Sequence, residues 1–159
     1  MATVESDVRV GEGKSVDLDA VMAVMEAAFG RAYGEAWTRS QLAGILPMSG
    51  VSLVVARDLR DDQVVGFSLD RQVADEAELL LLAVLPERRR RGVGRSLLQD
   101  FLVRARNEEV SQVHLEVRDG NPAVAMYDES GFAAVGRRRN YYHSLDGTRH
   151  DAITLALQL

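Results

Sequence analysis

A run of arginines and glycines, Arg89 to Gly94, is the part of the sequence best suited to carry chemistry. It reads R-R-R-G-V-G and separates an apolar stretch, which ends before Pro86, from an amphipathic stretch that begins at Val93. Backbone amides at the amino terminus of a helix bind phosphate or pyrophosphate, and glycine lets such a ligand approach the backbone closely. We therefore predict that this junction binds a phosphate-containing ligand.

The junction differs from the two common nucleotide-binding motifs. The dinucleotide fingerprint requires a third glycine where Leu97 stands, and no Lys-Ser or Lys-Thr pair follows as in a phosphate-binding loop. A short glycine motif alone is about as often a strand terminator as a binding site. The arginines from Arg88 to Arg91, with Arg95, suit a nucleic-acid patch or a solvated edge as well as a coenzyme phosphate. Because these arginines lie next to the predicted phosphate-binding loop, we favour a contact with a coenzyme phosphate for at least one of them.

Composition excludes thiol chemistry and disfavours a metal. The chain has no cysteine, so it has no disulfide, no thiolate metal site and no cysteine acyl-enzyme intermediate. Its histidines, His114, His143 and His150, lack the spacing of a metal site. We predict that the protein binds no metal.

The elements that must position the junction follow from hydrophobic periodicity. The apolar run from Glu78 to Leu85 predicts a strand in the middle of a sheet, covered on both faces. Thr38 and Gln41 form a capping box, which predicts the start of a short helix. The order of elements predicts a mixed α/β layer structure. We expect strands at 8–10, 51–56, 64–69, 78–85, 113–117, 132–135 continuing towards Tyr142, and 152–157, and helices at 18–29, after Thr38, at 93–105 and at 122–130.

The chain has the composition of a single globular domain. It contains 159 residues, of which 47% are hydrophobic and 27% charged, without repeats or linkers, so we expect one domain over residues 1–159. It shows no signal-peptide pattern and no apolar stretch of membrane-spanning length, so we expect a cytoplasmic protein without a membrane partner. The net charge of -5 argues against direct nucleic-acid binding and favours a basic partner.

Three segments, in order, resemble the GNAT superfamily of N-acetyltransferases. The segment LLLLAVLPERRRRGVGRSLL contains the superfamily's acyl-coenzyme A binding pattern, Arg/Gln-x-x-Gly-x-Gly/Ala, in full. LEVRDGNPAVAMYDESGF is similar to the second half of the superfamily core, and RRRNYY with DAITLAL resembles the RimI type, the ribosomal-protein alanine N-acetyltransferases. The resemblance covers residues 76–159 well and the amino-terminal part loosely. It implies a GNAT fold, a mixed sheet of about six to seven strands flanked by about four helices.

The resemblance also implies the reaction and its catalytic residues. In this superfamily an amine attacks the thioester of acetyl-coenzyme A directly, with a general base and a general acid. Glu116, mid-strand on the side away from the core, matches the RimI-type base. Tyr127 matches the tyrosine that donates a proton to the coenzyme sulfur, and a tyrosine hydroxyl with a pKa of about 10 is protonated at neutral pH. Without the resemblance, Glu116 would be interpreted as a solvent-exposed glutamate of a strand. Tyr127 would be interpreted as a tyrosine packed on a helix.

Coenzyme contacts are implied for the apolar strand, the glycine junction and one asparagine. The strand would offer backbone groups to the pantetheine arm and the thioester oxygen. Asn121 is less secure, because the chain is one residue shorter than the family's N-x-x-A-x-x-L-Y spacing between Asn121 and Tyr127, so the helix there is expected to start differently. The coenzyme-binding residues we predict are Leu82, Ala83, Val84, Arg89, Arg90, Arg91, Gly92, Val93, Gly94, Arg95, Ser96 and Asn121.

The acceptor is predicted from the carboxyl-terminal resemblance. Tyr141 and Tyr142 match the segment that shapes the acceptor groove of RimI-type enzymes, although edge packing explains exposed tyrosines equally well. The favoured acceptor is a protein N-terminus, such as the N-terminal alanine of a ribosomal protein; the alternative is a small-molecule amine. A module that only senses acyl-coenzyme A is disfavoured, because both Glu116 and Tyr127 are present. Specificity in this superfamily lies in variable segments, here 12–50 and 136–150.

Overall fold

Seven strands form one sheet in the computed structural model, which describes residues 7–30 and 32–159. The strand order is β1-β2-β3-β4-β5-β7-β6, antiparallel throughout except for the parallel pair β4–β5. Both the predicted element order and the mixed α/β class are confirmed. The strands are β1 (Val8–Glu12), β2 (Val51–Asp58), β3 (Val64–Val73), β4 (Glu76–Val84), β5 (Gln112–Arg118), β6 (Ala133–His143) and β7 (Arg149–Gln158), and the helices are α1 (Leu18–Phe29), α2 (Arg39–Ile45), α3 (Val93–Asn107) and α4 (Val124–Glu129).

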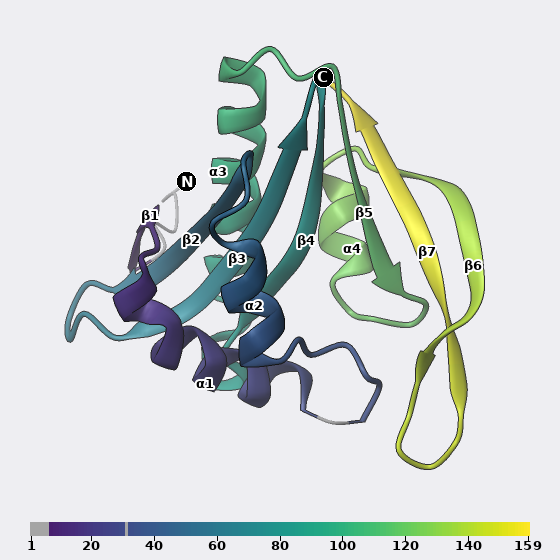
Figure 1. The fold of residues 1–159 in the computed structure, drawn as a ribbon, viewed down its shortest axis with the longest axis horizontal. Helices are drawn as coiled ribbons and strands as arrows, with labels where there is room; N and C mark the ends of the chain where they lie inside the picture. Colours follow the sequence, from purple (N-terminus) through teal and green to yellow (C-terminus); the bar gives the residue numbers. More distant parts are fainter. Residues whose placement is uncertain (1–6, 31) are drawn as a thin grey trace.

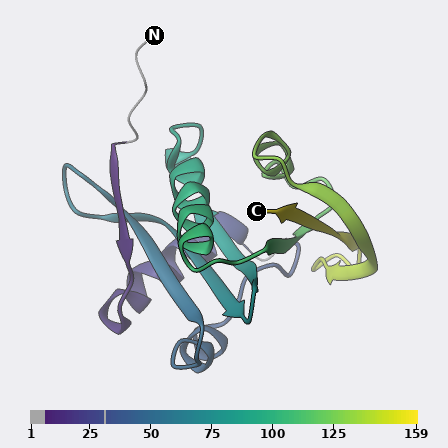
Figure 2. The same cartoon turned by 90° about the horizontal axis from the view of Figure 1, so that it is seen from above.

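The helices cover both faces of the sheet. Figures 1 and 2 show α1 and α2 on one face and α3 and α4 on the other. The predicted capping box starts α2, because Thr38 Oγ1 accepts from the Gln41 amide at 3.1 Å and Gln41 Oε1 accepts from the Thr38 amide at 2.8 Å. None of the helices in the described part of the chain is long and apolar enough to cross a membrane.

Strand β4 lies at the centre of the sheet, as predicted, and its buried side chains belong to two core clusters, one with α1 and one with α3. Leu79 and Leu81 are buried, and Leu79 packs against α3. Leu81 is buried in the cluster that contains Val21 and Met25 of α1. Leu80 and Leu82 are only partly buried and line a cavity. The strand is therefore buried at Leu79 and Leu81 but open to the cavity at Leu80 and Leu82, because apolar side chains that line a cavity have the same sequence pattern as core residues.

The sheet divides between β4 and β5. These two strands pair from Glu76–Gln112 to Leu79–Leu115 and then diverge (Figure 1). Beyond this point β4 is paired on its other side with β3, and β5 with β7. The edge of β4 that faces β5 therefore presents backbone groups without a strand partner from Leu80 onwards, and such groups bind ligands readily.

Candidate active site

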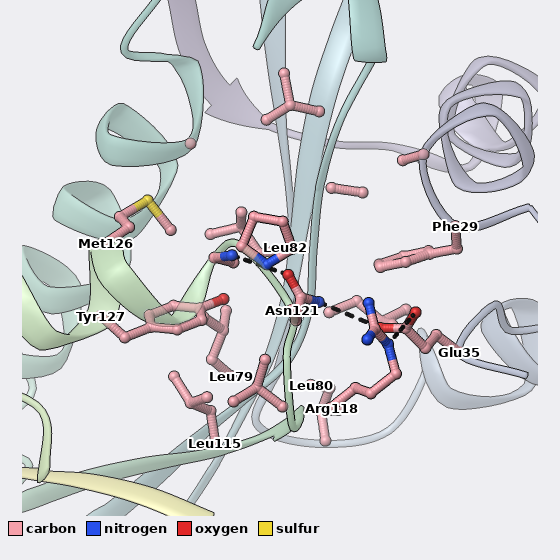
Figure 3. A pocket seen from close by; sticks show the side chains of 18 of the residues that line it. Phe29, Glu35, Leu79, Leu80, Leu82, Leu115, Arg118, Asn121, Met126 and Tyr127 are labelled. Atoms are coloured by element: carbon pink, nitrogen blue, oxygen red, sulfur yellow. Dashed lines mark hydrogen bonds and ion pairs between the residues drawn. The ribbon is translucent and has the colours of Figure 1, made fainter. Parts of the chain in front are cut away.

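A cavity of about 1210 Å³ occupies the division between β4 and β5. Its wall includes the loop between α1 and α2, both diverging strands, the start of α3 and side chains of α4. Figure 3 shows Met126 and Tyr127 on one side and Phe29 and Glu35 on the other. The cavity thus connects the two faces of the sheet.

Most of the predicted site residues line this cavity, although they come from segments far apart in the chain. Arg91 and Ser96 are predicted coenzyme ligands that the lining does not include. The predicted residues that line the cavity are Leu82, Ala83, Val84, Arg89, Arg90, Gly92, Val93, Gly94, Arg95, Glu116, Asn121, Tyr127, Tyr141 and Tyr142.

The glycine junction forms the predicted turn into a helix. Gly92 precedes α3 with a φ of 80°, a left-handed conformation that glycine adopts at little cost. A Cβ on Gly94 would lie 3.7 Å from Leu82 and 3.4 Å from Met126, so the missing side chain keeps this part of the wall open. The first turn of α3, with its unpaired amides and helix dipole, borders the cavity.

The arginines of the junction divide into anchored and unanchored groups. Arg88 is ion-paired with the buried Asp58, and Arg89 donates to the Ala28 carbonyl at 3.0 Å. Arg95 pairs with Glu129 on α4. Arg90 lines the cavity and has no ion-pair partner within the described chain. Arg90 is therefore a cavity-lining arginine without an anchor among the described residues, while Arg88 ties the junction to β2.

Glu116 is the first residue of β5 beyond the last pair with β4. Its side chain is 19% exposed, and its Oε1 lies 2.8 Å from Nε of Arg138 on β6. His114 lies on the same face, but its Nε2 is 3.7 Å from Oε2 of Glu78 rather than beside Glu116. Glu116 is thus a partly buried carboxylate in the cavity wall, held by one guanidinium.

Tyr127 is buried in the wall opposite Glu35, and its hydroxyl points into the cavity (Figure 3). Its ring packs edge-on against Phe132, with centroids 5.8 Å apart. Burial raises the pKa of Tyr127, and the nearby Tyr142 adds to this effect. Burial, together with Glu35, also raises the pKa of Tyr142, to about 12. Both hydroxyls therefore stay protonated at neutral pH and can donate.

Sequence reasoning missed a cluster around Glu35, in the loop between α1 and α2. Arg118 Nε lies 3.2 Å from Glu35 Oε1, and both side chains are about nine-tenths buried, at 11% and 10% exposed. The Arg118 guanidinium lies over the Tyr33 ring, 3.7 Å from its centroid. Asn121 Nδ2 donates to Glu35 Oε2 at 3.3 Å. No sequence signal identifies this cluster, because Glu35 and Arg118 are 83 residues apart.

Charge is distributed unevenly along the cavity. Arginines border the end at the start of α3. Glu35, Glu78 and Glu116 line the part near the carboxyl-terminal strands, where Arg118 pairs with Glu35 and Arg138 with Glu116. Such an arrangement suits an anionic group at one end and an amine at the other. In the described residues, no group of three or more potential ligands is placed to hold a metal ion, and the expectation of no metal stays a prediction.

Comparison with known proteins agrees with this geometry. Residues 22–145 match the family model of the acetyltransferase (GNAT) domain. The [ribosomal protein bS18]-alanine N-acetyltransferase of Escherichia coli K12 is 39% identical over 101 residues, which are 63% of this chain and 68% of that protein. The Haemophilus influenzae enzyme of the same name is 35% identical over 101 residues, covering 64% and 69%.

Solved structures show the same fold. The crystal structure of the ribosomal-protein-S18-alanine N-acetyltransferase from Escherichia coli superposes with a TM-score of 0.85 at 30% identity, over 95% of this chain and 93% of that one. Ard1 from Thermoplasma volcanium superposes with a TM-score of 0.80 at 27% identity, over 96% and 98%. With the divided sheet, the glycine junction and these matches, the chain belongs to the GNAT family and is an N-acetyltransferase.

Proposed function

We propose that the enzyme transfers the acetyl group of acetyl-coenzyme A to the α-amino group at a protein N-terminus. The preferred acceptor in this proposal is the N-terminal alanine of a ribosomal protein, as named for the bacterial relatives. The observation that carries the proposal is the cavity between β4 and β5, which joins the arginine-bordered start of α3 to Glu116 and Tyr127. This acceptor would place the enzyme in the cytoplasm.

The residues present fit acetyl-coenzyme A. The unpaired edge of β4, at Leu82, Ala83 and Val84, suits the amide groups of a pantetheine arm. The start of α3 suits the pyrophosphate, and beside it lies Arg90, for which the described residues offer no ion-pair partner. When bound, the coenzyme supplies an activated acetyl thioester at the centre of the cavity.

The side chains around the division suit transfer to an amine. An α-amino group has a pKa of about 7.7 to 8.0, so one carboxylate, acting directly or through a water, suffices to remove its proton near neutral pH. Glu116 is the carboxylate at the division, and we assign it the role of base. The protonated Tyr127 hydroxyl lies across the cavity, and we assign it the role of proton donor to the leaving sulfur.

The carboxylates and tyrosines near the carboxyl-terminal strands support a basic peptide as acceptor. Glu78 and Glu116 lie on neighbouring strands there, and Tyr141 and Tyr142 from β6 complete the wall. Tyrosines at such an edge pack against a peptide and also donate hydrogen bonds to its backbone. We assign them to acceptor binding.

The deciding experiment measures coenzyme A release from acetyl-coenzyme A with a panel of acceptors. The panel contains short alanine-led basic peptides, the same peptides with an acetylated N-terminus, and polyamines and other small amines. We expect turnover with the free peptides and none with the blocked ones, and mass spectrometry should locate the acetyl group on the terminal nitrogen. Turnover confined to small amines would replace the peptide acceptor with the alternative substrate class.

A further inference from the structure

The cluster around Glu35 connects the acceptor side of the cavity to the helix that carries Tyr127. One Glu35 oxygen accepts from Arg118 and the other from Asn121, at 3.2 and 3.3 Å. Asn121 Oδ1 in turn accepts from the Ala123 amide at 2.9 Å. Figure 3 shows this series of contacts crossing the cavity towards Tyr127.

The asparagine closes the turn that begins α4. Its own carbonyl accepts from the Val124 amide at 3.1 Å, while its side chain holds the Ala123 amide. The Ala123 carbonyl then accepts from the Tyr127 amide at 3.2 Å. The orientation of the Asn121 side chain therefore sets where the first turn of α4 lies, and with it the position of Tyr127.

The loop that carries Glu35 is itself fixed in place. Gly34 has a φ of +68°, and a Cβ there would lie 2.9 Å from the His143 carbonyl oxygen at the end of β6. Tyr33 packs its face on Arg118 and stands edge-on to His150 of β7, with ring centroids 5.1 Å apart. Glu35 thus reaches Asn121 from a support that is anchored on three strands.

We propose that Glu35 is a positioning residue that acts through Asn121 to place the Tyr127 hydroxyl for proton donation. The inference rests on the role proposed above for Tyr127. A carboxylate is required at position 35 because both of its partners are donors, an arginine N–H and an asparagine N–H, and only an acceptor with two free oxygens satisfies both. The engagement of Asn121 also accounts for how α4 starts despite the short spacing before Tyr127.

The first test is Glu35→Gln, which keeps the size of the side chain. The side-chain oxygen of the new glutamine will accept from Arg118, because a hydrogen bond from a charged donor is the stronger one. The NH2 group of this glutamine will then face the NH2 group of Asn121, so that two donors oppose each other. We expect kcat to fall roughly tenfold, with the KM for acetyl-coenzyme A changed by less than about twofold, because a small misplacement of a catalytic group acts mainly on the chemical step.

The decisive test exchanges the two groups. Asn121→Asp alone keeps an oxygen for the Ala123 amide but sets a second carboxylate against Glu35, so kcat should fall as well. In the double variant Glu35→Gln/Asn121→Asp, the new amide at position 35 donates to the new carboxylate at position 121, and the contact returns with its direction reversed. We expect kcat of the double variant to exceed that of either single variant.

A second readout separates positioning from simple stabilisation. In a Tyr127→Phe background, Glu35→Gln should lower kcat no further, because the group that it positions is already gone. Asp19→Asn is the matched control, since Asp19 is ion-paired with Arg39 between α1 and α2 on the exposed surface. It should leave kcat unchanged. The melting temperature of each variant is measured alongside.

The outcomes distinguish this inference from the proposed function. An unchanged kcat in Glu35→Gln, no recovery in the double variant, or an undiminished Glu35 effect in the Tyr127→Phe background would each overturn the positioning role alone. A fully active Tyr127→Phe enzyme would instead remove the proton-donor assignment, and the inference with it.

Discussion

At the scale of single residues, the assignment of Glu116 as base depends on where β4 and β5 separate. Glu116 follows Leu115, the last β5 residue that pairs with β4, and its side chain lies on the cavity side of the strand. If the pairing of β4 with β5 continued one residue further, Glu116 would have a β4 residue beside it instead of the cavity. A carboxylate at this point is partly shielded from water yet reachable from the acceptor end, which suits proton transfer from a bound amine.

Glu116→Gln is expected to lower kcat about a hundredfold or more, because the amide cannot take a proton from the ammonium. Coenzyme A affinity, measured by calorimetry, should stay within about twofold of the wild type. Glu78→Gln is the comparison, since Glu78 lines the same cavity but pairs with His114; it should change the KM for the acceptor peptide rather than kcat. Wild-type turnover in Glu116→Gln would remove Glu116 from the mechanism.

Arg138 holds one oxygen of that carboxylate and leaves the other for the acceptor. We expect Arg138→Ala to lower kcat about threefold to tenfold, because the carboxylate loses its orientation. The free energy of unfolding should change by less than about 1 kcal/mol, since exposed ion pairs contribute little. Arg139→Ala, at the adjacent position of β6, should leave both quantities unchanged in kinetic assays and urea titrations. An equal loss in both variants would contradict the orienting role.

At the scale of elements, the junction between β4 and α3 combines a strand end, a left-handed glycine and a helix start. Each feature follows from local sequence: the apolar run, Gly92 and the amphipathic stretch from Val93. The structure adds the anchors, with Arg88 bound to Asp58 and Arg89 to the Ala28 carbonyl. These contacts fix the direction in which the first turn of α3 presents its amides.

Gly92→Ala tests this element. A Cβ in the left-handed region costs about 1–2 kcal/mol, so the free energy of unfolding should fall by that amount. The KM for acetyl-coenzyme A should rise severalfold as the helix start shifts, with the KM for the acceptor peptide little changed. Gly44→Ala is the control. Gly44 lies in α2 with open space around it, so this substitution should stabilise the enzyme slightly. An unaltered KM for acetyl-coenzyme A would argue against coenzyme binding at the junction.

At the scale of the whole molecule, Asp58 joins the β2–β3 hairpin to the junction. Hydrogen bonds from the Arg60 amide and side chain, and then from Arg88, hold the pKa of Asp58 well below its usual range. A carboxylate whose pKa is lowered by folding stabilises the protein above its unfolded pKa, which is about 3.9. That stabilisation is lost as the pH falls through the lower, folded value.

We therefore expect urea midpoints of the wild type to fall as the pH drops below about 4. Asp58→Asn should unfold at lower urea than the wild type at pH 7, because Arg88 loses its charged partner, and the two proteins should converge in acid. A constant difference between them down to about pH 2 would show that the ionisation of Asp58 does not contribute to stability.

The sequence by itself determined the order of elements, the α2 capping box, the glycine junction and the family resemblance. These are local features, because backbone conformation and hydrophobic period depend on near neighbours in the chain. The assignments of Glu116 and Tyr127 came from the motif, and their catalytic roles stay predictions. The sequence did not distinguish Leu80, which lines the cavity, from its buried neighbours, because apolar residues that face a cavity and those that face a helix have the same pattern.

Only the tertiary structure decided which distant groups meet. It brought Glu35 to Arg118 and Asn121, Arg138 to Glu116, and His114 to Glu78. It paired Arg88 with Asp58. It also placed the point at which β4 and β5 separate. Such contacts join residues tens of positions apart, and their geometry follows from strand order and register across the whole sheet, which no local pattern in the chain specifies.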